Sequence, residues 1–185
     1  GKLMPWFITV ANIESRDPSQ VIAGNERVVR PRLTDAAFFY RTDRQHPLEA
    51  QVDALKRVTF QTQLGSQHDK SERVRALAKS ITAAIGGNPA LADRAAVLSK
   101  CDLLTHMVGE FPELQGHVGL LYARHQGEPE PVAAAIEEHY LPRFAGDTLP
   151  GTPAGRALAL ADRLDTLAGC FAAGLAPRGS ADPQG

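Results

Sequence analysis

The sequence has little cysteine, no long apolar run and almost no net charge, and each absence excludes a class of protein. Its 185 residues contain only two cysteines, Cys101 and Cys170, which are too few for a disulfide framework and suit a reducing cytoplasm. No run reaches the ~18 consecutive apolar residues of a membrane span. A net charge of −1 with 43% hydrophobic residues argues against a disordered chain and against a protein that coats nucleic acid. We therefore expect a globular, cytoplasmic protein with no membrane partner.

The spacing of apolar residues predicts an all-α fold that is preceded by a short strand and a helical segment. Residues 6–12, WFITVAN, alternate apolar with small or polar side chains, a pattern typical of a strand. Helical spacing follows over residues 25–44, where Pro31 predicts a break and Thr34 a new cap, and Pro47 opens a further helix. We divide the chain into residues 1–58, the end of an N-terminal region, residues 59–176, an all-α domain, and residues 177–185, a flexible tail.

Three helices of the all-α domain carry specific expectations. Asp69 is predicted to cap a helix that ends near Ile85, so the dipeptide His68-Asp69 is a helix start and not a metal motif. Residues 90–110 predict a single helix that is apolar around almost its whole circumference and therefore buried, with His106 facing the interior. The helix over residues 153–173 places four large apolar side chains on one face: Leu160, Leu164, Leu167 and Phe171.

Charged residues interrupt the apolar helix around residue 100, and this is the most informative anomaly in the sequence. Lys100 and Asp102 stand where apolar residues are expected. Because an unpaired charge in a protein interior costs several kcal/mol, both must find partners or reach a cleft. On the last long helix Asp162 and Asp165 lie three residues apart, on adjoining parts of one surface.

The segments AAVLSKCD, residues 95–102, and ADRLD, residues 161–165, resemble two elements of the HD-type metal phosphohydrolases. That family needs a His on its first core helix, a His-Asp pair at the end of the buried helix and a late Asp. Together these side chains hold a divalent metal that activates water.

The residues at the corresponding positions of this chain depart from the HD pattern. Lys70 takes the place of the first His, Ser99-Lys100 or Cys101-Asp102 that of the His-Asp pair, and only Asp162 matches. We expect no metal, but a vestigial cleft that is formed by Lys70, Lys100, Asp102 and Asp162. Lys70 or Lys100 is predicted to pair with Asp162, and Lys100→Ala is then expected to cost more stability than removal of both charges. A working metal-dependent HD-type phosphohydrolase remains the alternative.

Positive charge gathers in the first half of the chain. Between Gly24 and Lys79 there are eleven Lys and Arg residues against seven Asp and Glu. Such an excess is typical of a surface that contacts phosphates, although ordinary ion pairs on helix surfaces would give the same composition. The candidate phosphate-binding residues are Arg27, Arg30 and Arg32, which are close in sequence, and Lys70 and Arg73, which share a helix face.

A series of blocks along the chain resembles the β subunit of bacterial glycyl-tRNA synthetase. The blocks are FITVANIESRDP, GNERVVRPRLTDAAFFYRTDR, FQTQLGSQHDKSERV, LSKCDLLTHMVGEFPELQG, GEPEPVAAAIEEHYLPRFAGDTLP and ALALADRLDTLAG. The resemblance implies that this chain is an interior portion of a longer subunit, including a degenerate HD-like domain.

The same resemblance implies a function. It implies an α2β2 enzyme that attaches glycine to tRNA-Gly, in which the α subunit holds the catalytic core and uses ATP and magnesium. This portion of β would bind no cofactor and hold no catalytic residue, and it would contribute tRNA binding, with the five basic residues above as candidates, and subunit scaffolding. A purely structural module between subunits is a further alternative.

Overall fold

The computed structural model describes residues 4–175. Its elements follow in chain order: α1 (Pro18–Asp43), η1 (Leu48–Gln51), η2 (Asp53–Arg57), β1 (Thr59–Gln61), β2 (Gly65–Ser66), α2 (Gln67–Ala84), α3 (Pro89–Leu98), η3 (Cys101–Leu104), α4 (His106–Glu110), η4 (Pro112–Leu114), α5 (His117–His125), α6 (Glu130–Glu138) and α7 (Pro153–Ala172). The expected all-α class is confirmed, because the sheet found in these residues is one short antiparallel hairpin of β1 and β2. No helix within residues 4–175 is both long enough and apolar enough to cross a membrane.

The chain packs into two compact units that divide after Arg41. Residues 42–58 belong to the second, helical unit, where Leu48 and Leu55 are buried in its core. The predicted domain boundary at residue 58 stays a prediction, and the predicted tail at residues 177–185 lies outside the described residues.

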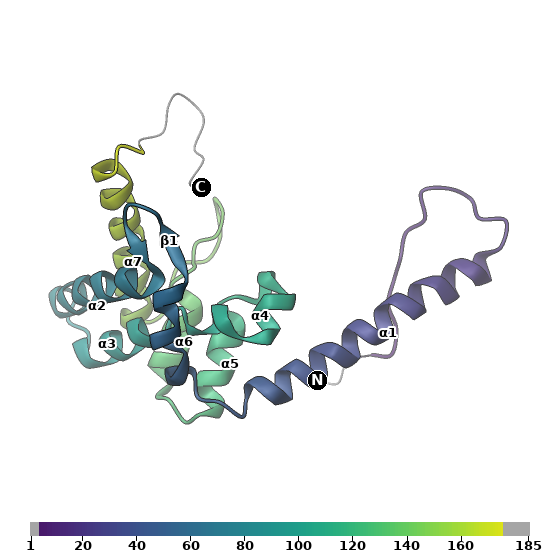
Figure 1. The fold of residues 1–185 in the computed structure, drawn as a ribbon, viewed down its shortest axis with the longest axis horizontal. Helices are drawn as coiled ribbons and strands as arrows, with labels where there is room; N and C mark the ends of the chain where they lie inside the picture. The colour runs from purple at the N-terminus through teal and green to yellow at the C-terminus, as the bar shows by residue number, and fades with distance from the viewer. Residues whose placement is uncertain (1–3, 176–185) are drawn as a thin grey trace. The chain divides into compact units, whose positions relative to one another are not determined.

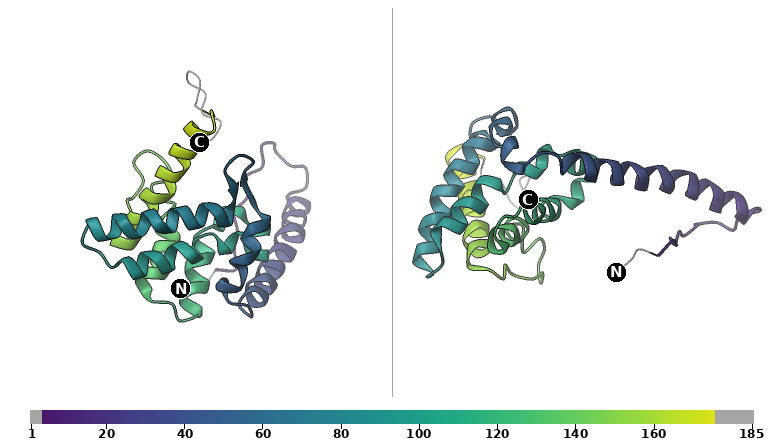
Figure 2. Two further views of the ribbon diagram at one scale, coloured as in Figure 1. Left: turned by 60° about the vertical axis from the view of Figure 1, so that its left-hand side comes forward. Right: turned by 90° about the horizontal axis from the view of Figure 1, so that it is seen from below.

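The helical unit is built on α2, α3, α6 and α7, which pack against one another, with α5 against α6 (Figures 1 and 2). Alanine fills much of this core, and Ala78, Ala95 and Ala161 have no exposed surface. Small side chains let helix axes approach closely, and at Gly119 of α5 an added Cβ would lie 2.6 Å from Cγ2 of Ile136 on α6. The close packing positions the polar side chains that are described below.

Two expectations for the N-terminal unit are wrong. Helix α1 continues through Pro31 without a break, and the hydroxyl of Thr34 donates to the Arg30 carbonyl at 3.0 Å instead of capping a new helix. A proline removes one backbone bond at a cost of about 3 kcal/mol, which a long helix can absorb. The strand predicted over residues 6–12 is not formed, since in the described residues no other segment pairs with it.

The single helix predicted over residues 90–110 is also wrong. Helix α3 ends at Leu98, and after η3 the chain begins again with α4, whose first residue is His106. The hydroxyl of Thr105 accepts from the Val108 N–H at 3.2 Å and so starts the new helix. His106 does not face the interior, because its side chain is 64% exposed.

Helix α2 begins at a capping box rather than at Asp69. The N-cap is Ser66, whose hydroxyl accepts from the Asp69 N–H at 3.2 Å, while the Asp69 carboxylate accepts from the Ser66 N–H at 2.8 Å. Asp69 is therefore the third helical residue, and its pKa is lowered chiefly by the Ser66 N–H. The reading of His68-Asp69 as a helix start is confirmed, with the cap moved to Ser66.

Candidate functional site

Lys70 of α2 is almost completely buried, and its ammonium points at α7. Its Nζ lies 3.3 Å from Oδ1 of Asp162 and donates to the Asp162 backbone carbonyl at 3.3 Å. It also donates to the hydroxyl of Thr166, one turn further along α7. The ring of Phe60 on β1 covers the ammonium, with 4.3 Å from Nζ to the ring centroid.

Lys100, directly after α3, brings a second ammonium to the same carboxylate. Its Nζ lies 3.8 Å from Oδ2 of Asp162, 2.8 Å from Nε2 of His139 and 3.2 Å from the hydroxyl of Tyr140. The expected ion pair is confirmed, and Asp162 lies within 4 Å of both lysines rather than one. We call Lys70, Lys100, His139, Tyr140, Asp162 and Thr166 the lysine cluster.

The ring of His139 acts as an acceptor in this cluster. Its Nδ1 lies 2.7 Å from the Ile136 carbonyl oxygen, so Nδ1 carries the proton and Nε2 accepts from Lys100. Burial, and then the charge of Lys100, hold the pKa of His139 well below its ordinary value. The histidine is therefore neutral, and the cluster contains one carboxylate against two ammonium groups.

Burial and charge act in opposite directions on the charged members of the cluster. Burial lowers the pKa of Lys100 to about 8, against the attraction of Asp162. For Asp162, burial alone would raise the pKa, but the charge of Lys100, with His139 and Lys70, outweighs it and the pKa is lowered. Asp162 is thus ionised because the lysines are close to it.

Asp102 has a separate role from the lysine cluster. Its carboxylate is fully buried and accepts from the backbone N–H of Gly116 at 2.6 Å, just before the first turn of α5. Gly116 has a φ of 82°, and an added Cβ would lie 2.6 Å from the ring of Tyr140, so no other residue fits. Burial raises the pKa of Asp102. The charge of Asp102 still raises the pKa of Lys100 slightly, but its hydrogen bond holds the Gly116 backbone at the start of α5.

The residues present do not fit a divalent metal. Within residues 4–175 no three His, Cys, Asp or Glu side chains come together as a possible metal site. The Nε2 of His139 and the carboxylate of Asp162 would be acceptable ligands. The Nζ of Lys100, however, lies 2.8 Å from this Nε2 and 3.8 Å from Oδ2 of Asp162. An ammonium repels a metal ion and supplies the positive charge in its place. We derive no water activation and no hydrolytic step from this cleft.

The pH dependence of stability should show the buried ammonium of Lys100. Between its folded pKa of about 8 and its ordinary value of 10.5, the unfolded chain binds a proton that the folded chain does not. Lys100 should therefore make the free energy of unfolding rise with pH in this window, by at most about 1.4 kcal/mol per pH unit. Above pH 9.0 the buried thiol of Cys101, whose pKa is raised to about 12, acts in the opposite direction, so the net rise should appear below that pH. Urea denaturation from pH 7 to 10.5 checks this, with Lys100→Met as the control. An equal rise in that variant would contradict the assignment.

The five candidate phosphate-binding residues do not lie together. Lys70 is buried, and Arg73 gives its guanidinium to Asp165 of α7, with Nε–Oδ1 at 2.7 Å and Nη2–Oδ2 at 3.1 Å. The other three lie on α1, where each is exposed. Residues three apart on a helix share a face and residues two apart do not, so Arg27 and Arg30 lie together while Arg32 points to another side.

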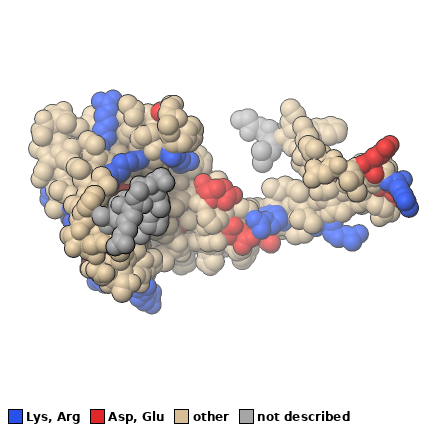
Figure 3. Space-filling view, turned by 90° about the horizontal axis from the view of Figure 1, so that it is seen from above, with Lys and Arg blue, Asp and Glu red and all other residues tan. Residues whose placement is uncertain are grey.

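Ion pairs from distant parts of the sequence neutralise most of the basic region within the helical unit. Arg75 and Lys79 of α2 both reach Asp93 of α3, at 2.6 and 3.6 Å. The alternative of ordinary pairing therefore holds for α2. Along α1 acidic side chains stand before and after the three arginines, and Figure 3 shows positive and negative side chains there instead of one large positive patch.

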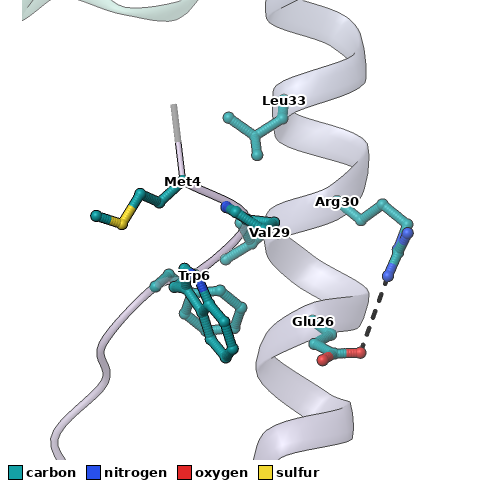
Figure 4. Close-up of a pocket in the computed structure, with 8 residues that line it drawn as sticks. Met4, Trp6, Glu26, Val29, Arg30 and Leu33 are labelled. Carbon is teal, nitrogen blue, oxygen red and sulfur yellow. Dashed lines mark ion pairs between the residues drawn. The ribbon is translucent and has the colours of Figure 1, made fainter. Parts of the chain in front are cut away.

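The N-terminal unit contains an apolar hollow of about 270 Å³ between residues 4–7 and one face of α1 (Figure 4). Met4, Trp6, Val29 and Leu33 line it, and Trp6 remains 79% exposed. Arg30 stands at its edge, with Nη2 3.9 Å from Oε2 of Glu26. This hollow brings together no nucleophile or acid–base pair, and we assign it no chemistry.

Sequence reasoning missed His139, Tyr140 and Thr166 in the lysine cluster. The signal for the first two was a His-Tyr pair at the end of an amphipathic helix, followed by Leu-Pro. Such a pair is equally common on a surface, so the pattern alone did not distinguish a buried acceptor. Thr166 follows Asp162 by one helical turn, and that spacing could have placed it beside the carboxylate.

Comparisons with known proteins agree on one family. The family model described as "Glycyl-tRNA synthetase beta subunit" matches residues 1–185. Relatives named "Glycine--tRNA ligase beta subunit" include those of Pseudomonas fluorescens and Chromohalobacter salexigens, each 61% identical, and that of Pseudomonas putida, 59% identical. Each match covers 183 residues and 99% of this chain. The chain spans 27% of the length of these relatives.

Proposed function

Because the chain belongs to the glycyl-tRNA synthetase β subunit family, we propose that it serves as one portion of glycine–tRNA ligase. The alignments with these relatives include 99% of this chain at about 60% identity, which supports this placement. In the proposed enzyme the catalytic core, ATP and magnesium lie with the α subunit of an α2β2 assembly in the cytoplasm. This portion of β contributes scaffolding and a contact with tRNA-Gly.

The scaffolding role is supported by a helical unit that is stabilised internally by buried charge. The lysine cluster joins α2, the end of α3, the end of α6 and α7 through one carboxylate. A tethered ammonium in place of a metal gives a rigid contact without a dissociable ion or a reactive water. The cleft is thus suited to hold helices together and not to catalyse phosphoester hydrolysis.

The contact with tRNA is supported by one observation on α1: Arg27 and Arg30 are exposed on a common face of a helix that has only one buried residue, Asp43. Exposed guanidinium groups on one helix face can contact the phosphates of a nucleic acid, and the ion pair of Arg30 with Glu26 is solvent-exposed. Of the five basic candidates, these two carry the proposal. Arg32, on another side of α1, becomes the matched control.

Charge reversal on α1 tests this contact in the assembled enzyme. We expect Arg27→Glu with Arg30→Glu to weaken tRNA-Gly binding about tenfold at low salt and to reduce the slope of log K against log salt by about two. Fluorescence anisotropy with tRNA-Gly at two salt concentrations measures both quantities. Arg32→Glu should bind as the unchanged enzyme does.

Two results would contradict the contact with tRNA. An unchanged salt slope in the double variant would leave only the scaffolding role. An equal loss in Arg32→Glu would mean that net charge, and not a defined face, determines binding. A pull-down of each variant with the α subunit separates a tRNA defect from a defect in assembly.

A further inference from the structure

The outer face of α7 exposes four large apolar side chains. Leu160, Leu164, Leu167 and Phe171 are between 49% and 62% exposed. The sequence placed them on one face, but the helix turns that face outward and buries the other side, with Ala154, Leu158 and Asp165. We call these four residues the α7 apolar face.

The other side of α7 explains why the large residues point outward. Helices α2 and α6 approach α7 closely, and most of the buried positions on α7 are alanine or glycine, with Leu158 as the large apolar exception. The inner side is also closely packed at Gly169, where an added Cβ would lie 2.9 Å from Cδ1 of Leu64 in the β1–β2 turn. The inner face is therefore filled, and the leucines are excess apolar surface in this chain.

A hollow extends the α7 apolar face toward the segment between α6 and α7. Its volume is about 260 Å³, and Leu141, Leu149, Pro150 and Leu160 line it. Leu149 is 74% exposed. Leu160 belongs both to this hollow and to the α7 apolar face, so the two form one continuous apolar surface.

The spacing of the four residues indicates the shape of what covers them. Steps of four, three and four residues repeat the pattern by which one helix packs along another at about 20°. A strand or an extended peptide would leave alternate positions of such a row uncovered. The face contains no basic residue among its four members. The two arginines that line the adjoining hollow, Arg156 and Arg163, donate to backbone carbonyls, so the surface favours a protein segment over RNA.

The size of the surface favours an occupant from the same polypeptide. Four half-exposed side chains form a patch of a few hundred Å², whereas a stable interface between separate chains buries about 800 Å² on each partner. A segment of the same chain needs less area, because its effective concentration is on the order of millimolar. Relatives of this chain have most of their length outside the matched region, since the match covers 27% of them.

We propose that a helix of the same β subunit, from outside these 185 residues, packs lengthwise on the α7 apolar face. The proposal rests on the place of this chain within a longer β subunit and is independent of the contact with tRNA. It assigns α7 two functions in one helix, with Lys70 and Lys100 held on its inner side and a further helical segment held on its outer side.

Photo-cross-linking in the full-length α–β enzyme without tRNA tests the proposal. The benzophenone analogue of phenylalanine replaces Leu164, and separately Leu160 in case one position disturbs the helix. The control places it at Ile85, at the end of α2, which is equally exposed at 48% but lies outside the face. We expect a several-fold higher yield at the α7 positions, with the cross-linked peptide from the same β chain beyond residues 1–185.

Mass spectrometry of a mixture of isotope-labelled and unlabelled β distinguishes the other occupants. Cross-links to the α subunit, to a second β copy or to residues within 1–185 would overturn the proposal, as would a yield no higher than at Ile85. Anisotropy with tRNA-Gly on the same variants keeps the two proposals separate, because binding of tRNA can fail while the cross-link persists.

Discussion

Asp162→Asn is expected to lower the stability of this chain by about 3–5 kcal/mol, the loss typical when one partner of a buried ion pair is removed. The carboxylate lies 3.3 Å from Lys70 and 3.8 Å from Lys100, and both lysine side chains are at most 10% exposed. Without it, two buried ammonium groups face each other with no negative charge between them. Urea denaturation followed by circular dichroism measures the loss at pH 7.

The control for this prediction is the same substitution in an exposed pair. Asp53 and Lys56 form a lysine–aspartate contact at 2.7 Å with side chains 87% and 57% exposed. Asp53→Asn should leave the urea midpoint unchanged, because solvent screens such a pair. If both variants behave alike, the Asp162 carboxylate does not compensate the lysines.

The arrangement also corrects the expectation for Lys100→Ala. That expectation assumed a single lysine, whose removal would leave Asp162 without a partner. Since Lys70 stays 3.3 Å from the carboxylate, Lys100→Ala should cost less than Asp162→Asn, and removal of all three charges should restore part of the loss.

The deficit of Asp162→Asn should itself depend on pH. The attraction of Asp162 is the main influence that opposes burial at Lys100, so the pKa of that lysine falls further in the variant. As pH rises, Lys100 loses its proton and the unpaired charge disappears. The difference from the unchanged chain should therefore shrink as pH rises to about 8, where the unchanged chain still holds the proton, and stay level above it. A difference that is also constant below pH 8 would contradict this account.

The sequence could predict the lysine cluster only in part. A lysine and an aspartate within an apolar segment are forced to find partners, and the resemblance to the HD-type phosphohydrolases then pointed from Lys100 to Asp162. No such requirement applied to His139, because a histidine costs little at a helix end whether it is buried or exposed. Its role depends on α6 and α3 meeting, which is a property of the tertiary structure.

The errors in the fold have the same origin. Periodicity correctly predicted the helices around residues 67–84 and 153–172, where each helix buries one face. It failed over residues 90–110, because the new helix after the break starts with hydrogen bonds from the N–H groups of His106 and Met107 to Asp43, which is far away in sequence. For the α7 leucines it correctly placed the four residues on one face but gave no direction, because a pattern shows that residues share a face but not which face the core covers.

The prediction of a phosphate-binding side in the basic half of the sequence also depended on tertiary contacts that the sequence does not show. The excess of eleven positive over seven negative residues suggested a phosphate-binding side. In the folded chain Asp93, Asp162 and Asp165 neutralise the basic residues of α2. Composition sums charge along the chain, whereas binding depends on charge that stays accessible at a surface, and on α1 Arg27, Arg30 and Arg32 are exposed.

Asp43→Ala is expected to lower stability by about 3–5 kcal/mol, because it removes the acceptor of a buried group of donors. Asp43, the last residue of α1, accepts from the backbone N–H groups of His106 and Met107 at 3.0 and 2.9 Å. Its carboxylate also contacts Nδ1 of His106 at 2.7 Å and accepts from the buried hydroxyl of Tyr122 at 3.2 Å. One side chain thus caps α4 across 63 residues of sequence.

Two further variants separate the carboxylate from its individual contacts. Tyr122→Phe removes one hydrogen bond and should cost about 1 kcal/mol. Asp43→Asn keeps one acceptor oxygen for the α4 N–H groups and should fall between Tyr122→Phe and Asp43→Ala. Hydrogen exchange should rise at the amides of His106 and Met107 in Asp43→Ala, ahead of global unfolding. If Asp43→Ala costs no more than Tyr122→Phe, then Thr105 alone starts α4 and the break after α3 has its cause within the segment itself.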